Sequence, residues 1–148
     1  MKLLPLSLLL LFAAAPAAQS QTAADSSAIR AAALDYVEGW YEGNPDRMSR
    51  ALHPELVKRI VVTDTATNRS VLDNMGTSSL VNATRRGFGK KTPKEKQQKE
   101  VRILDIFAGA ASVKTVMADW IDYMQLAKVN DRWVIVNVLW AMKPDRAG

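Results

Sequence analysis

The sequence predicts an α+β domain in which about three N-terminal helices pack on a strongly curved mixed or antiparallel sheet. Apolar residues recur at helical spacing in the first half of the chain, whereas the last third consists of long β-prone runs separated by turn residues. The chain has 148 residues, of which 48% are hydrophobic. This is enough apolar material for one domain with its own core.

The N-terminus has the three parts of a secretory signal peptide. Lys2 supplies a positive charge, residues 3–12 form an apolar run, and small residues follow. We expect residues 1–20 to be cleaved and residues 21–27 to form a short disordered start, which places the mature protein in a bacterial periplasm or outside the cell. The alternative is a membrane anchor, but prolines interrupt the run and it is shorter than the roughly 20 residues that a bilayer requires.

A long amphipathic helix is expected next, from a serine cap to Gly43. Its apolar stripe consists of Ile29, Ala33, Tyr36 and Trp40, which recur at the spacing of one helix face. The inner face of this helix therefore carries two aromatic side chains.

Two further helices are predicted from their boundary residues. Asn44 followed by Pro45 is typical of a helix start, so a short second helix should begin there. It should end near His53, because the residue before Pro54 avoids the helical region. A third helix is expected at residues 74–86, ended by the glycine that follows.

The remaining segments predict strands. Residues 60–62 and 71–72 indicate a strand pair around a polar loop, and three longer strands are expected at residues 101–107, 112–128 and 132–140. The middle one is so long that it must bend. Both faces of the long strands are largely apolar, so one face should take the helices while the other needs a different cover. We expect a homodimer through that face; the alternative is a sheet curved enough to cover itself.

The net charge of +5 is concentrated in one stretch, because residues 85–102 carry eight Lys or Arg side chains against two Glu. We expect a solvated connector here, with a weak contact to an anionic surface as the alternative. Nucleic acid is not an expected partner, since the stretch lacks the interleaved aromatic residues that track a phosphate backbone. The chain has no cysteine and one histidine, which excludes a disulfide framework, a cysteine-ligated metal and a cluster of imidazoles.

A distinctive set of residues recurs mainly in the last two predicted strands. Its members are Trp120 to Lys128, Asn130, Trp133, Asn137 and Val138 to Trp140, together with Tyr36, Trp40, His53 and Pro54. By these residues the chain resembles the putative lumazine-binding branch of the nuclear transport factor 2-like superfamily. The resemblance spans residues 28–143, leaves residues 144–148 as a tail, and implies a cone-shaped, cystatin-like roll. The superfamily contains isomerases, dehydratases, cyclases and dimerisation modules, so the resemblance implies no single reaction. The branch name implies a pteridine-like ligand.

A cone fold implies a cavity between the first helix and the concave side of the sheet, where a small apolar or aromatic ligand could bind. Aromatic walls suit a flat ligand by stacking, while a tyrosine and an aspartate could orient its polar edge. The alternative is that these aromatic residues are ordinary core. The candidate lining residues are Tyr36, Trp40, Leu52, His53, Leu80, Trp120, Asp122, Tyr123 and Trp140.

An isomerase, dehydratase or cyclase is the alternative to a binding protein. Steroid isomerases of the superfamily use a tyrosine and a neutral aspartic acid to stabilise an oxyanion. Tyr36 could take the first role and Asp119 or Asp122 the second, but these two have opposite parity, so at most one faces the cavity. His53 is the candidate for acid–base chemistry. Because no general base, metal site or cofactor can be assigned, we expect a binding protein without a cofactor, and a non-catalytic dimeric interaction module is a further alternative.

The homodimer prediction can be tested directly. Light scattering on a size-exclusion column should give about twice the mass of the mature chain if two copies pair through the sheet. A monomer at micromolar concentration would contradict it.

Overall fold

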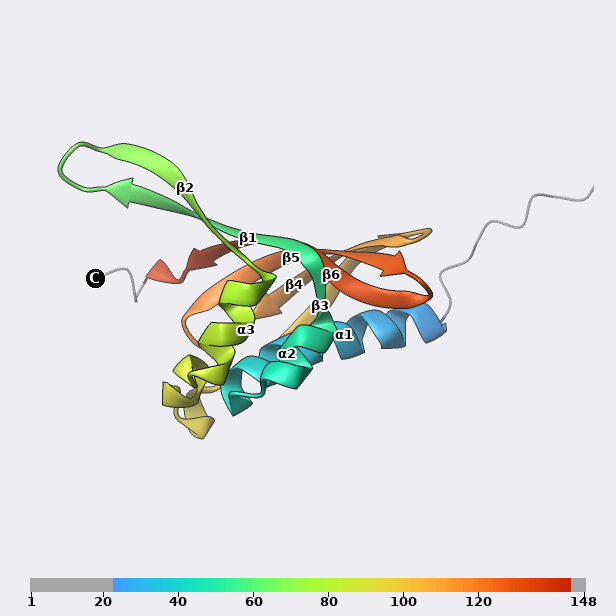
Figure 1. The fold of residues 1–148 in the computed structure, drawn as a ribbon. Helices are drawn as coiled ribbons and strands as arrows, with labels where there is room; N and C mark the ends of the chain where they lie inside the picture. The colour runs from blue at the N-terminus through green and yellow to red at the C-terminus, as the bar shows by residue number, and fades with distance from the viewer. Residues whose placement is uncertain (1–22, 145–148) are drawn as a thin grey trace, which may run out of the picture.

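The computed structural model describes residues 23–144 (Figure 1). The expected signal peptide at residues 1–20 lies outside the described residues. Within the described part, no helix is long and apolar enough to cross a bilayer. The helices are α1 (Ala23–Glu42), α2 (Pro45–Ala51) and α3 (Thr77–Arg85), with two short 3-10 helices, η1 (Phe88–Lys91) and η2 (Lys94–Lys96). The strands are β1 (Leu52–Asp64), β2 (Arg69–Gly76), β3 (Glu100–Phe107), β4 (Ala110–Val116), β5 (Trp120–Val129) and β6 (Arg132–Met142).

The strands form one six-stranded sheet in the order β2-β1-β6-β5-β4-β3. Every neighbouring pair is antiparallel except β1 and β6, which run parallel, so the sheet is mixed. The three helices lie on one side of the sheet, and the β1–β2 hairpin projects beyond them (Figure 1). The predicted α+β class, with three helices packed on a mixed sheet, is confirmed.

The core lies between α1 and the inner face of the sheet. Ile29, Ala33 and Tyr36 of α1 are buried, as the apolar stripe predicts. The facing sheet residues Met124 and Val138 are also buried. The helix begins at Ala23, so residues 23–27, which were expected to belong to a disordered start, are helical.

Two of the predicted elements have different boundaries in the structure. The run at residues 112–128 is not one bent strand; a turn closed by the bond from the Met117 N–H to the Trp120 carbonyl (2.9 Å) divides it into β4 and β5. The third helix begins at Thr77 and not at residue 74, because the preceding residues pair with β1, as in Arg59 opposite Asn74. Pairing that extends the hairpin takes precedence over the local helical pattern.

The hairpin is longer than its apolar residues predict. β1 starts at Leu52, directly after α2, and its ladder with β2 continues to Asp64 opposite Arg69. The polar ends still pair, and the Thr63 and Ser70 hydroxyls lie 2.9 Å apart across the hairpin. A hairpin that projects into solvent does not need one buried face, so its sequence carries no alternation to detect.

The basic stretch at residues 85–102 packs on the C-terminal end of α1. The Tyr41 hydroxyl donates to the Gln98 carbonyl (3.2 Å) and accepts from the Ala118 N–H (2.8 Å), which joins α1, the stretch and the β4–β5 turn. Gly89 is buried against the backbone carbonyl of Trp40. The stretch that was expected to be a solvated connector is therefore packed against the rest of the domain.

Gly89→Ala should destabilise the protein, because a Cβ at this position would overlap the Trp40 carbonyl. We expect a loss of about 1–3 kcal/mol in the free energy of unfolding, the usual cost of overpacking, measured by urea denaturation. Gly109→Ala is the matched control, because a Cβ there meets nothing nearer than the Lys128 side chain at 3.8 Å. Equal stability of the two variants would contradict the packing described.

Candidate functional site

A charged cluster is buried where α1 crosses the inner face of the sheet. The ammonium Nζ of Lys58 lies 2.5 Å from Oδ1 of Asp122 and 2.5 Å from the hydroxyl of Tyr36. Tyr36 is 2% exposed, Lys58 4% and Asp122 0%. The domain therefore contains an ion pair in its interior, with a tyrosine hydroxyl bonded to both charges.

Three separate elements bring these side chains together. Lys58 lies on β1 opposite Val138, and Asp122 lies on β5 opposite Trp140, so both point to the inner face of the sheet. Tyr36 reaches them from the apolar stripe of α1. The cluster thus depends on the register of β1 and β5 and on the docking of α1.

Asp122 accepts hydrogen bonds on both carboxylate oxygens. Besides Lys58, the Tyr36 hydroxyl donates to Oδ1 (3.4 Å), while the Trp120 indole N–H (3.0 Å) and the Thr115 hydroxyl (3.3 Å) donate to Oδ2. No buried side-chain nitrogen or oxygen in the described part of the chain lacks a partner. This complete set of donors offsets part of the cost of burying the Asp122 side chain.

Aromatic rings enclose the ammonium group. Nζ of Lys58 lies 4.7 Å from the ring centroid of Trp140, 5.3 Å from that of Tyr36 and 5.7 Å from that of Trp120. Ring faces attract a cation, most strongly where water is excluded. The rings therefore add to the stabilisation that Asp122 gives to Lys58.

The burial of this cluster shifts two of its pKa values. Burial lowers the pKa of Lys58, and the charge and hydrogen bond of Asp122 oppose that shift. Burial also raises the pKa of Tyr36 well above its ordinary value, and here the negative charge of Asp122 adds to the effect. Tyr36 is therefore protonated at neutral pH, and its hydroxyl donates a hydrogen bond to Asp122.

This arrangement differs from the oxyanion-binding pair that the resemblance to steroid isomerases implies. That pair needs a neutral aspartic acid and a tyrosine that both donate to a substrate. Here Asp122 accepts from all its partners, and the ammonium of Lys58 contacts the oxygens of both Tyr36 and Asp122. The hydrogen-bonding groups of Tyr36 and Asp122 are therefore occupied by partners within the protein.

The other catalytic candidates lie apart from this cluster. Asp119 is in the turn between β4 and β5, whereas Asp122 faces the interior. Of the two aspartates, Asp122 is therefore the one that points inward. His53 is half-buried at the start of β1, where its Nδ1 accepts from the backbone N–H of Glu55 (3.2 Å). No group of three or more His, Asp and Glu side chains converges as a metal site within residues 23–144.

The remaining predicted lining residues divide between the core and the outer face. Leu52 and Leu80 are buried among other apolar side chains. Tyr123 is 43% exposed on the side of the sheet away from the helices, where the ammonium of Lys114 lies 5.6 Å from its ring centroid. Tyr123 therefore does not share a surface with Asp122.

Lys58 is the one cluster residue absent from the sequence-based candidates. Lys58 lies two residues after Leu56, so both side chains point to the same face of the strand, and both are buried. A lysine at a position where the alternating pattern calls for an apolar residue was the signal that could have identified it. The signal was hidden because the predicted strand began only at residue 60.

A groove opens beside the cluster, with a volume of about 330 Å³. The rings of Trp40 and Trp120 meet edge to face at its wall, with centroids 5.8 Å apart and an interplanar angle of 81°. Trp120 and Trp140 make a second edge-to-face contact at 5.9 Å. We call this the aromatic groove; its lining residues are Trp40, Phe88, Lys91, Thr92, Pro93, Lys96, Ala118, Asp119 and Trp120.

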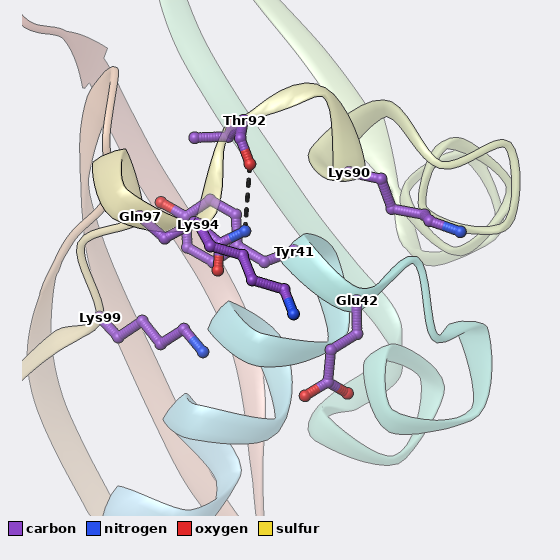
Figure 2. A pocket seen from close by; sticks show the side chains of 7 residues that line it. All are labelled: Tyr41, Glu42, Lys90, Thr92, Lys94, Gln97 and Lys99. Carbon is purple, nitrogen blue, oxygen red and sulfur yellow. Dashed lines mark hydrogen bonds between the residues drawn. The ribbon is translucent and has the colours of Figure 1, made fainter.

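A second groove of about 650 Å³ lies next to the first, and Thr92 belongs to both. Figure 2 shows the side chains of three lysines around it, between the end of α1 and the basic stretch. We call this the lysine groove; its lining residues are Tyr41, Glu42, Lys90, Thr92, Lys94, Gln97 and Lys99.

The sequence and the fold were compared with known proteins. A family model described as putative lumazine-binding matches residues 24–141, which is most of the chain. No curated protein matches the chain in sequence.

Solved structures share the fold. A nuclear transport factor 2-like protein of unknown function from Shewanella baltica OS155 has 20% identity and a TM-score of 0.61, covering 84% of this chain and 98% of its own. A second such protein, from Silicibacter pomeroyi DSS-3, has 13% identity and a TM-score of 0.60 over 83% and 100% of the two chains. A domain with a cystatin-like fold from Nostoc punctiforme PCC 73102 has 15% identity and a TM-score of 0.54 over 83% and 80%. At these identities the likeness shows the fold alone.

Lys58→Met should cost about 3–5 kcal/mol in the free energy of unfolding, because it leaves the carboxylate of Asp122 buried without a countercharge. Adding Asp122→Asn should recover part of that loss, since it removes the unpaired charge. An amide oxygen in the place of Oδ2 can still accept from Trp120 and Thr115, and the amide NH2 can donate to the Tyr36 hydroxyl. Denaturant unfolding of both single variants and the double variant measures the coupling. If the losses of the two single variants simply add in the double variant, the buried ion pair is contradicted. Arg102→Gln is the control; at this exposed position it should change the free energy of unfolding by less than about 0.5 kcal/mol.

Tyr36→Phe should cost about 1.5–3 kcal/mol at pH 8, since it removes hydrogen bonds to charged groups. A tyrosine in the unfolded chain ionises near pH 10, whereas folded Tyr36 does not, because its pKa is raised. The stability that Tyr36 contributes is therefore complete below pH 10 and decreases as the pH rises above it. The difference between wild type and Tyr36→Phe should shrink accordingly in urea titrations above pH 10. A difference that grows with pH would refute this, and exposed Tyr123→Phe should show neither effect.

Proposed function

Because the chain belongs to the putative lumazine-binding family, we propose that it binds a small flat ligand of the pteridine type and that the aromatic groove is the place of binding. The expected signal peptide supports the further proposal that the protein acts after export from the bacterial cytoplasm.

The observation that carries the proposal is the corner made by two tryptophans. Trp40 and Trp120 present rings at 81° to each other, so a flat ligand can stack on one face and meet the edge of the other. Phe88, which is 42% exposed, lines the same groove. A volume of about 330 Å³ is at the small end of ligand pockets and suits a flat system of two or three fused rings.

The charged cluster explains why the groove, and not the centre of the cone, is the proposed site. The Tyr36 hydroxyl, the Lys58 ammonium and the Asp122 carboxylate bond to one another there, so these polar groups already have partners within the protein. Trp120 belongs to both places, since its ring lines the groove and its N–H donates to Asp122. A binding protein therefore fits these contacts better than an isomerase, dehydratase or cyclase.

The homodimer through the sheet remains a proposal. Val61 and Leu72 are exposed opposite each other on β1 and β2, and Leu139 and Tyr123 are exposed opposite each other on β6 and β5. All four lie on the sheet face away from the helices. Their exposure supports the expected pairing of two copies, which the mass measurement above tests.

Equilibrium dialysis with lumazine tests the binding proposal. We expect saturable binding to the wild type, weakened about fivefold in Phe88→Ala, because a stacking contact of about 1 kcal/mol is removed. Phe107→Ala is the matched control, since Phe107 is 81% exposed at the end of β3 and lines neither groove. Absence of saturable binding, or an equal loss in both variants, would count against the proposal.

A further inference from the structure

The lysine groove concentrates positive charge on a rigid frame. Lys90 comes from η1, Lys94 from η2 and Lys99 from the segment before β3, and all three line one groove. In Figure 2 the ammonium of Lys90 points away from those of Lys94 and Lys99, so the Lys90 side chain must turn to reach a shared ligand. Glu42 is the single carboxylate among the lining residues, and its Oε1 accepts from Arg47 at 2.9 Å. The groove therefore carries three ammonium groups against one carboxylate that is already paired.

Two of these ammonium groups have no ion-pair partner among residues 23–144. Lys99 lies 3.8 Å from a carboxylate oxygen of Glu38. Over residues 23–144, no carboxylate lies within ion-pair distance of Lys90 or Lys94. An anion that entered the groove would supply the missing countercharge.

The backbone that carries the lysines is held in place by hydrogen bonds. The Gln97 side-chain amide donates to the Thr92 carbonyl (3.1 Å; Figure 2), and Tyr41 donates to the carbonyl of Gln98. Buried Gly89 fixes the start of the stretch against Trp40. The charges are therefore presented by an ordered surface, which lowers the entropic cost of binding an anion.

The lysine groove continues into the aromatic groove. Thr92 lines both, and Lys91 and Lys96 stand on the aromatic side of it. A ligand whose ring lies against Trp120 can therefore extend a chain past Thr92 toward Lys94. The positive charge next to the ring site favours a chain that carries a negatively charged group.

We propose that the ligand of the aromatic groove bears a phosphorylated tail and that the lysine groove binds its phosphate. This inference rests on the proposed function for the position of the ring. It adds a second recognition element, in which Lys90 and Lys94 act as point charges on the phosphate oxygens. The ligand class is a phosphate ester of a flat heteroaromatic compound.

Riboflavin and flavin mononucleotide are matched probes, because they share a flat ring and a ribityl chain and differ only in one phosphate. In equilibrium dialysis at low salt, we expect flavin mononucleotide to bind at least about tenfold more tightly than riboflavin. The ratio should fall in 0.5 M NaCl, where exposed charges are screened. Tripolyphosphate should compete with flavin mononucleotide and leave riboflavin binding unchanged.

Lys90→Gln combined with Lys94→Gln should reduce the affinity for flavin mononucleotide to that for riboflavin, without changing riboflavin binding. The control removes the same charge from the outer face, as Arg102→Gln with Lys114→Gln, positions that oppose each other on β3 and β4. This control variant should keep the preference for the phosphate.

The possible failures are distinguishable. Equal affinity for the two flavins would overturn the phosphate inference while leaving the ring site intact. Absence of binding of lumazine and of both flavins would overturn the proposed function and the inference together. Sedimentation with phosphatidylglycerol vesicles that depends on Lys90 and Lys94, without a preference for flavin mononucleotide, would assign the groove to a membrane surface and overturn the inference.

Discussion

The buried ion pair between Lys58 and Asp122 is the interaction on which the rest of the structure depends. Removing two charges from water costs several kcal/mol per ion, and only close pairing with further hydrogen bonds offsets that cost. The pair therefore requires donors from Tyr36, Thr115 and Trp120 and the register that brings β1, β5 and α1 together. The aromatic groove lies beside this pair, because Trp120 both lines the groove and donates to Asp122.

Trp120 connects the interior of the domain to its surface. Its N–H is held by Asp122, and its ring forms the corner of the aromatic groove with Trp40. The orientation of the groove wall is thus set by a buried carboxylate. The opposite side of the groove belongs to the basic stretch, which Gly89 and Tyr41 hold against α1. The surface site therefore inherits its rigidity from the core.

Sequence patterns predicted the fold because helical spacing and β-prone runs are local properties. They also predicted that Tyr36 meets either Asp119 or Asp122 in the interior, and the structure shows that the buried partner is Asp122. Lys58 was missed because its strand begins with few apolar residues and owes its position to pairing with β6, a contact distant in sequence. The grooves were missed for a related reason: the docking of Gly89 under Trp40 has no local signature, so a charged stretch with glycines and a proline was interpreted as a connector.

A crystal structure of the protein with flavin mononucleotide bound would distinguish a ligand in the two grooves from a ligand in the interior. We expect the ring between Phe88 and Trp120, the phosphate near Lys90 and Lys94, and an unbroken contact between Lys58 and Asp122. A ring in the interior of the cone, with Lys58 displaced from Asp122, would contradict this expectation.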